Sequence, residues 1–309
     1  MKKRILAIGL TSVLALQVIA APQAAGSPVS AASTSTITEE ISTMVAPGLQ
    51  QSQFVYTDGG NRNACFTLEF DPKDPQITLA AGTPGDGDFY RLSTVRDMAE
   101  AALVNGKHVV AAMNSDMYNT STGEPWGVVV KDGREIHGYN VAGRSWRFFG
   151  LKKDGTPIYG DQTVYHANQG DIQQAMGVHS VLVENGAVVN ADQSVIYAPR
   201  VAVGVKADGT VFFLLADGRQ GTYSKGLTLE QTAQLMRARG AVWAGNLDGG
   251  GSATLLSRMP GENNFTVRNK PSDGRERRVA NSWIFISNVE SDADYQAVLQ
   301  EIKNPSIAA

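Results

Sequence analysis

The sequence contains one cysteine and only four histidines, and these shortages exclude several kinds of site. With Cys65 alone, the chain can form no intramolecular disulfide and no cysteine-based zinc cluster. The histidines are scattered, and none follows the HExxH spacing of a zinc-dependent hydrolase. We therefore expect neither a disulfide framework nor a histidine-rich zinc site.

Charge is also sparse, because charged residues make up 18% of the 309 residues and the net charge is −3. This balance argues against nucleic-acid binding as the main task. No Gly-Lys-Ser/Thr follows the glycine-rich stretch of the sequence and no G-x-S-x-G occurs there, so neither a Walker A loop nor a nucleophile elbow is present. Apolar residues amount to 42%, which is enough for a folded core.

The first residues have the three parts of a secretory signal peptide. A positive start at Met1–Arg4 precedes an apolar run over residues 5–21, and small residues follow up to Gly26. We predict a signal peptide over residues 1–26 and export, either secreted or to the cell envelope or periplasm. An uncleaved N-terminal anchor is the alternative. No later stretch reaches the roughly 18 apolar residues of a membrane span, so none is expected after cleavage.

The remaining chain divides into a linker, one main domain and a tail. Ser and Thr dominate the segment after the signal peptide, which predicts a flexible linker over residues 27–44. The main domain is expected over residues 45–289. The tail, residues 290–309, contains a pattern for a short helix at Asp292–Lys303.

Glycine is abundant, at 32 residues, and many glycines belong to turns. Four apolar runs are followed by an Asx-Gly pair, which is the strongest short signal for a β-hairpin. The pairs are Asp132-Gly133, Asp154-Gly155, Asn185-Gly186 and Asp208-Gly209. With a few helices beside them, these hairpins predict an α+β fold: mixed, largely antiparallel sheets with flanking helices in a single main domain.

Two helices are predicted, and each leads into a similar segment. The first covers Ser93–Asn105 with Ser93 as N-cap, and the second covers Thr228–Arg239 with a capping box. A glycine ends each helix, and an apolar strand ending in Asn-x-Asp follows. The two tripeptides are Asn114-Ser115-Asp116 and Asn246-Leu247-Asp248. Two equivalent units could thus deliver polar groups to one site, with coincidence as the alternative.

The most specific stretch is the run Gly249-Gly250-Gly251 between Asp248 and Ser252. Three consecutive glycines cost conformational entropy on folding, so they indicate a close backbone approach or unusual dihedral angles. Successive backbone N–H groups can form an anion-binding nest there. A flexible turn between two strands is the alternative.

Further polar residues stand at strand ends or turns. Asp217 and Arg219 follow an apolar strand, where an acid or base would stand beside a phosphate-binding guanidinium, or where a hairpin simply ends. Arg200 and Arg277 also lie next to strands and could converge on the same anion instead of being surface charges. Asp116 is followed by Tyr118 and a second aromatic residue, a combination common in sugar-binding clefts but also found in solvated loops.

The order of these segments resembles the phosphodiester glycosidase family over about residues 46–288. Asp-Gly-Gly-Gly-Ser is the most distinctive piece, and the others recur in matching order. The segments that carry the resemblance are Met113–Tyr118, Gly127–Gly133, Pro199–Gly204, Asp217-Gly218-Arg219, Gly226–Glu230, Asn246–Thr254, Glu276-Arg277 and Val279-Ala280-Asn281.

The resemblance implies a hydrolase that cleaves the glycosidic bond of a sugar-1-phosphodiester, such as an α-N-acetylglucosamine-1-phosphodiester, in a glycan or glycolipid. No cofactor is implied, and a divalent cation is left open. The carboxylates assigned to catalysis are Asp248, Asp217 and Asp116. The residues assigned to substrate and phosphate binding are Asn114, Arg200, Arg219, Gly249, Gly250, Gly251, Ser252, Arg277 and Asn281.

Two other functions compete with this one. A non-catalytic glycan-binding module of the cell envelope would use aromatic residues such as Tyr118, Trp126 and Trp243 and would need no carboxylates. A metal-dependent phosphoesterase would use three aspartates as oxygen ligands and cleave P–O instead of C–O. Its ligands would be Asp116, Asp217 and Asp248.

Overall fold

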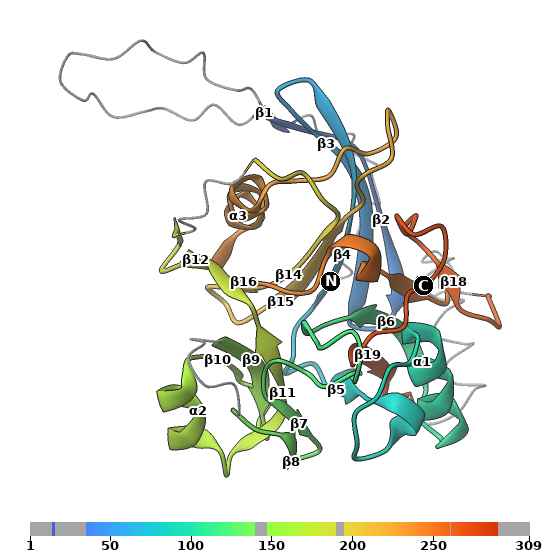
Figure 1. The fold of residues 1–309 in the computed structure, drawn as a ribbon, viewed down its shortest axis with the longest axis vertical. Helices are drawn as coiled ribbons and strands as arrows, with labels where there is room; N and C mark the ends of the chain where they lie inside the picture. The colour runs from blue at the N-terminus through green and yellow to red at the C-terminus, as the bar shows by residue number, and fades with distance from the viewer. Residues whose placement is uncertain (1–13, 16–34, 140–146, 190–194, 260, 290–309) are drawn as a thin grey trace, which may run out of the picture.

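The computed structural model describes residues 14–15, 35–139, 147–189, 195–259 and 261–289, and its strands form three sheets (Figure 1). The largest contains, in spatial order, β1 (Leu14–Ala15), β2 (Thr36–Ala46), β3 (Leu49–Asp58), β4 (Asn61–Phe70), β15 (Val211–Ala216), β14 (Arg200–Lys206), β16 (Ala241–Asn246), β12 (Ser180–Glu184) and β13 (Ala187–Val188). The second contains β10 (Pro157–Gly160), β9 (Arg147–Lys152), β11 (Ile172–Val178), β7 (Val129–Lys131) and β8 (Arg134–His137). The third contains β18 (Thr266–Val267), β17 (Leu255–Ser257), β6 (Val109–Asn114), β19 (Ser282–Ser287) and β5 (Ile77–Gly82).

Neighbouring strands pair antiparallel, which confirms the predicted fold class. All four Asx-Gly pairs connect the strands of a hairpin, between β7 and β8, β9 and β10, β12 and β13, and β14 and β15. Asp132 and Asn185 have φ of 50° and 51°, the left-handed conformation that these turns require. The conformation of these turns is therefore set by their own two residues.

The core lies where the three sheets meet. Phe213 of β15, Phe149 of β9 and Trp283 of β19 are buried against one another, one from each sheet. The ring centroid of Phe149 lies 6.1 Å from that of Phe213 and 5.6 Å from that of Trp283. Burial of each such side chain stabilises the fold by about 1.5–3 kcal/mol, so this contact holds the sheets in one body.

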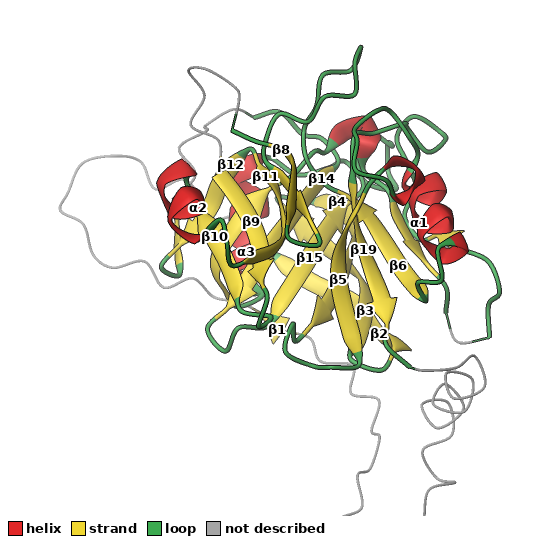
Figure 2. Cartoon of the chain, turned by 90° about the horizontal axis from the view of Figure 1, so that it is seen from below, coloured by secondary structure: helices red, strands yellow, loops and turns green. Residues whose placement is uncertain are grey.

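Three α-helices lie on the outside of the packed strands (Figure 2). They are α1 (Val95–Val104), α2 (Gln162–Asn168) and α3 (Leu229–Ala238), and two short 3-10 helices cover Pro84–Asp86 and Gly250–Ser252. The capping box predicted for α3 is confirmed, because Thr228 accepts from the Gln231 amide. Among these helices none is both long and apolar enough to cross a membrane, a statement limited to the described residues.

The start of α1 differs from the prediction. Thr94 is the N-cap and shares a capping box with Asp97, so the helix begins one residue later than a Ser93 cap would place it. Ser93 does not cap because its backbone exchanges hydrogen bonds with Val279 of another segment, so its carbonyl oxygen accepts the Val279 amide instead of the first amide of the helix. Helix α2 was not predicted at all, since seven residues are too few for a periodic pattern.

The linker predicted over residues 27–44 is wrong for its second half. Thr36–Ala46 forms β2, which pairs antiparallel with β3, and the Ser42 and Ser52 hydroxyls lie 2.7 Å apart across the pair. Ser and Thr are common in solvated chain, but Thr and Ile are β-branched and suit a strand that has a partner. The residues of the predicted signal peptide lie outside the described residues except for 14–15, and the predicted helix Asp292–Lys303 lies outside them entirely.

Candidate functional site

Two strand ends from different sheets meet at the site. Strand β6 of the third sheet leads into Asn114-Ser115-Asp116, and β16 of the largest sheet leads into Asp248. The Asp248 amide donates to the Ser115 carbonyl oxygen over 2.8 Å. The predicted convergence of the two Asn-x-Asp segments is therefore confirmed, and it gives the site two independently anchored walls.

Asn114 is fully buried and holds the glycine-rich loop closed. Its Nδ2 donates to the Asp248 carbonyl oxygen over 2.7 Å, and its Oδ1 accepts from the Thr254 amide over 3.0 Å. One side chain thus joins both ends of the loop 248–254. The structure uses the Asn114 amide to shape the loop, whereas the sequence suggested contact with a sugar.

The glycine run lets two arginines approach the loop closely. A Cβ on Gly250, whose φ is 59°, would stand 3.3 Å from Nη1 of Arg219. A Cβ on Gly251 would overlap the guanidinium of Arg277. Arg219 and Arg277 therefore flank the glycines, and a larger side chain at Gly251 would push one of them away.

The expected row of free amides is wrong at two positions. The Gly250 amide donates to the Pro199 carbonyl oxygen over 2.9 Å, and the Ser252 amide donates to the Gly249 carbonyl oxygen over 3.1 Å. The Ser252 bond belongs to the tight 3-10 turn over Gly250–Ser252, and the Gly250 bond ties the turn to the neighbouring segment. In this conformation the cationic surface of the site comes from the arginine side chains, not from these two N–H groups.

Asp248 is the partly exposed carboxylate of the site. Burial raises its pKa to about 6, while a hydrogen bond from Ser252, the charge of Arg277 and the Gly249 amide act in the opposite direction. Because this pKa lies below 7, Asp248 is mostly ionised at neutral pH. It lies on the same loop as the arginine-flanked glycines.

Asp116 lies deeper, with 2% of its surface exposed. Burial raises its pKa to about 8, against hydrogen bonds from the Gly127 and Met117 amides, and the charge of Asp248 adds to the increase. The Gly127 amide is 2.7 Å from Oδ2, and a Cβ on Gly177 would stand 2.5 Å from the same oxygen. At neutral pH the site thus combines an ionised and a protonated carboxyl group, a division typical of acid–base sites.

Asp217 supports the loop from outside. Its Oδ1 accepts from Asn269 Nδ2 over 2.9 Å, and its Oδ2 accepts from the Lys270 amide over 2.8 Å and the Tyr223 hydroxyl over 3.1 Å. Asn269 in turn donates to the Ala253 carbonyl oxygen over 3.0 Å, just after the glycines. Both Asp217 oxygens accept hydrogen bonds from protein groups, so this residue supports the glycine-rich loop through Asn269.

The side chains of Arg200 and Asn281, two further predicted site residues, also bond groups of the protein itself. Arg200 donates from Nε to the Leu227 carbonyl oxygen and from Nη2 to that of Ile196, both over 2.9 Å. Asn281 accepts the Asp116 amide over 2.9 Å and so fixes the position of that aspartate. Arg200 is thus directed at main-chain carbonyls, while Arg219 and Arg277 border the loop.

His137 is a neighbour of the site that the sequence analysis did not single out. Its Nδ1 lies 2.7 Å from the Gly127 carbonyl oxygen, and its Nε2 lies 3.6 Å from Glu124. The Tyr90 ring packs edge-on against it at 5.8 Å. His137 therefore steadies the residue whose amide holds Asp116. No spacing signal links it to Asp116, because the contact depends on how β8 returns beside β7.

The donor set of a metal-dependent phosphoesterase is not assembled in the described part of the chain. No group of three or more His, Cys, Asp or Glu side chains there could hold a metal ion. Of the three aspartates considered as ligands, Asp217 accepts hydrogen bonds from protein donors with both of its carboxylate oxygens.

Comparison with known proteins gives a consistent result. Residues 107–286 match the family model described as Phosphodiester glycosidase. N-acetylglucosamine-1-phosphodiester alpha-N-acetylglucosaminidase of Mus musculus is 30% identical over 227 residues, which are 67% of this chain and 41% of that protein. The Homo sapiens protein of the same name is 29% identical over 228 residues, with the same coverage of 67% and 41%. The chain thus spans about two fifths of the length of these relatives.

A solved structure has the same fold. The catalytic domain of the zebrafish N-acetylglucosamine-1-phosphodiester alpha-N-acetylglucosaminidase superposes with a TM-score of 0.59 at 21% identity. The match covers 80% of this chain and 87% of that one. At this identity the likeness concerns the arrangement of sheets and helices.

Proposed function

Because this chain belongs to the phosphodiester glycosidase family, we propose that it hydrolyses the bond between the anomeric carbon of a sugar and the oxygen of a phosphodiester. The observation that carries the proposal is one loop. Asp248 begins it, and the arginines Arg219 and Arg277 border the glycines that follow. This places a carboxylate on the same loop as two guanidinium groups, of which that of Arg277 is also paired with Asp273 over 2.7 Å.

The arginines suit the leaving group. When the C1–O bond breaks, negative charge develops on the departing phosphate, and guanidinium groups beside it stabilise that charge through charge-assisted hydrogen bonds. Phosphate is a good leaving group, so it needs little protonation. The role of Arg219 and Arg277 is therefore to bind the phosphate and to lower the barrier to its departure.

Asp248 is the carboxylate for the anomeric carbon. As an anion it can stabilise the positive charge that develops at C1, or take a proton from the attacking water. The water oxygen bonds to C1, the C1–O bond breaks, and the products are the free sugar and a phosphomonoester. Asp116 stays protonated behind it at neutral pH, because burial raises its pKa to about 8.

We further propose that the sugar is an α-linked N-acetylglucosamine in an exported glycan or glycolipid. The names of the mouse and human relatives support the sugar and linkage, and the N-terminal pattern over residues 1–26 supports export. Tyr118, which is buried beside Ser252 at the site, is suited to border the sugar.

Release of N-acetylglucosamine from UDP-N-acetylglucosamine, itself a sugar-1-phosphodiester, tests the proposal. We expect sugar release by the full chain and its near loss in the variant Asp248→Asn. Binding without release by the unmodified chain would favour the glycan-binding module instead. Sugar release that Asp248→Asn leaves unchanged would remove Asp248 from the mechanism.

A further inference from the structure

A further carboxylate, that of Asp273, borders the glycine-rich loop beside Arg277. Its Oδ2 accepts a hydrogen bond from Nε of Arg277 over 2.9 Å and lies 2.7 Å from Nη2 of the same guanidinium. A Cβ on Gly251 would overlap Oδ1 of Asp273 as well as that guanidinium. One oxygen of Asp273 therefore binds Arg277, and the other oxygen faces the loop.

This ion pair contributes little to the stability of its segment. The side chains of Arg277 and Asp273 are 39% and 35% exposed, and solvent screens the attraction of a pair in such a position. The pair has two effects at the loop instead. It orients the guanidinium of Arg277, and it places a negative charge next to the position proposed for the phosphate.

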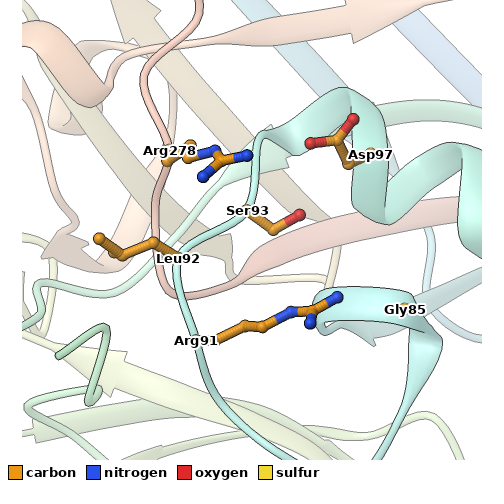
Figure 3. A pocket seen from close by; sticks show the side chains of 6 residues that line it. All are labelled: Gly85, Arg91, Leu92, Ser93, Asp97 and Arg278. Atoms are coloured by element: carbon orange, nitrogen blue, oxygen red, sulfur yellow. The ribbon is translucent and has the colours of Figure 1, made fainter.

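Asp273 offsets part of the positive charge at the loop. Two guanidinium groups, those of Arg219 and Arg277, border the glycines, and Asp273 adds one negative charge beside them. The next arginine along the chain does not compensate for it, because Arg278 lines a separate pocket at the start of α1. Figure 3 shows the Arg278 side chain extending toward Asp97 in that pocket. A phosphate at the loop therefore meets less than the full charge of two arginines.

Charge distinguishes the substrate of the proposed reaction from its product. A phosphodiester carries one negative charge, whereas a phosphomonoester carries nearly two at neutral pH because its second pKa is about 6. When water bonds to C1 and gives up a proton, the C1–O bond breaks and the phosphate keeps the bonding electrons, which give it this second charge. The repulsion between Asp273 and a phosphate grows with the product of their charges, so it is about twice as strong for the monoester.

We propose that Asp273 is a specificity-determining residue that selects singly charged phosphate esters at this loop. It favours sugar-1-phosphodiesters over sugar-1-phosphates, and it promotes release of the phosphomonoester product. The preference among sugar phosphates rests on the proposed function, whereas the selectivity for the charge of a phosphate ester does not.

The variant Asp273→Asn separates the charge of this residue from its effect on the orientation of Arg277. Both contacts use the same carboxylate oxygen, Oδ2, so an amide oxygen in its place still accepts from Nε and Nη2 while the negative charge is lost. The matched control is Asp154→Asn, which makes the same chemical change at an exposed hairpin turn.

Binding is tested at pH 7 on the full chain with dimethyl phosphate, a monoanion, and methyl phosphate, mostly a dianion, by following the amide NMR signals of residues 249–252. We expect Asp273→Asn to raise the affinity for dimethyl phosphate about threefold and that for methyl phosphate about tenfold, because the repulsion that is removed doubles with the second charge. Asp154→Asn should leave both affinities unchanged. Equal changes for the two esters in Asp273→Asn, no change, or no binding of either ester would overturn the selectivity, since loss of an orienting contact affects both esters alike.

Kinetics then test the substrate preference. The methyl phosphodiester of N-acetylglucosamine is compared with N-acetylglucosamine 1-phosphate, and we expect a higher kcat/KM for the diester. Asp273→Asn should narrow the ratio of the two kcat/KM values about threefold, for the same electrostatic reason. Protonation of Asp248 affects both compounds and cancels in this ratio. An unchanged ratio would overturn the preference among sugar phosphates, whereas selective binding of the methyl phosphates with no hydrolysis of either sugar compound would refute the proposed function alone.

Discussion

The two carboxyl groups of the site predict a specific pH profile for the reaction. With the pKa of Asp248 at about 6 and that of Asp116 at about 8, the competent form has Asp248 ionised and Asp116 neutral. The value of kcat/KM should therefore be highest between these two pKa values and fall about tenfold per pH unit outside them. The acidic limb reports protonation of Asp248, and the alkaline limb reports ionisation of Asp116.

Asp116→Asn isolates the alkaline limb. The amide stays neutral at every pH and its oxygen can still accept the Gly127 amide, so the decline above pH 8 should disappear while the acidic limb remains. From the same pKa, neutral Asp116 falls from about nine tenths at pH 7 to about one tenth at pH 9, so the ratio of variant to unmodified kcat/KM should rise about tenfold. An exposed hairpin carboxylate, Asp154, supplies the control Asp154→Asn, whose profile should match the unmodified chain.

The same group makes folding stability depend on pH. Because burial raises the folded pKa of Asp116 above its ordinary value of 3.8, the folded state binds this proton more tightly than the unfolded state. The contribution is fully present below about pH 4 and is lost as the pH rises through 8, with an upper bound of about 6 kcal/mol. From pH 5 to pH 9, the free energy of unfolding measured with urea should fall less in Asp116→Asn than in the unmodified chain. A persistent alkaline limb in that variant, together with an equal loss of stability, would refute this assignment.

Three further changes probe the loop. Asp248→Asn should lower kcat by at least about 100-fold in a correctly folded variant, and near-normal turnover would remove Asp248 from catalysis. Arg219→Ala should reduce hydrolysis of phosphodiesters far more than that of an aryl glycoside without phosphate, and equal losses would make Arg219 structural. Gly251→Ala should displace Arg277 and lower kcat/KM for phosphodiesters by about tenfold or more, since the new Cβ overlaps the guanidinium. The control Gly170→Ala meets no atom within 4 Å and should leave the rate unchanged.

The parts of the fold that depend on local chemistry could be predicted from the sequence. The Asx-Gly pairs predicted all four hairpins because their left-handed backbone is set within two residues. The capping box of Thr228 and Gln231 likewise predicted the start of α3. The Asn-x-Asp repeat indicated that Asp116 and Asp248 approach each other, since both follow strands of the same pattern.

The parts that depend on distant partners could not be predicted. The sequence predicts Ser93 as an N-cap. Its backbone is instead hydrogen-bonded to Val279, which lies 186 positions further along the chain, and Thr94 is the N-cap. Arg200 had the same sequence context as the other arginines, yet its guanidinium bonds two carbonyl oxygens. The pairing of His137 with Gly127 arises from a hairpin register that composition does not reveal.

The bond that breaks is the central claim, and hydrolysis in ¹⁸O-labelled water tests it most directly. Cleavage of C1–O by water attack at the anomeric carbon places the label in the released sugar. Mass spectrometry of both products of a sugar-1-phosphodiester should therefore find ¹⁸O in the sugar and none in the phosphomonoester. Label in the phosphate would show attack at phosphorus and would contradict the assignment of Asp248, Arg219 and Arg277.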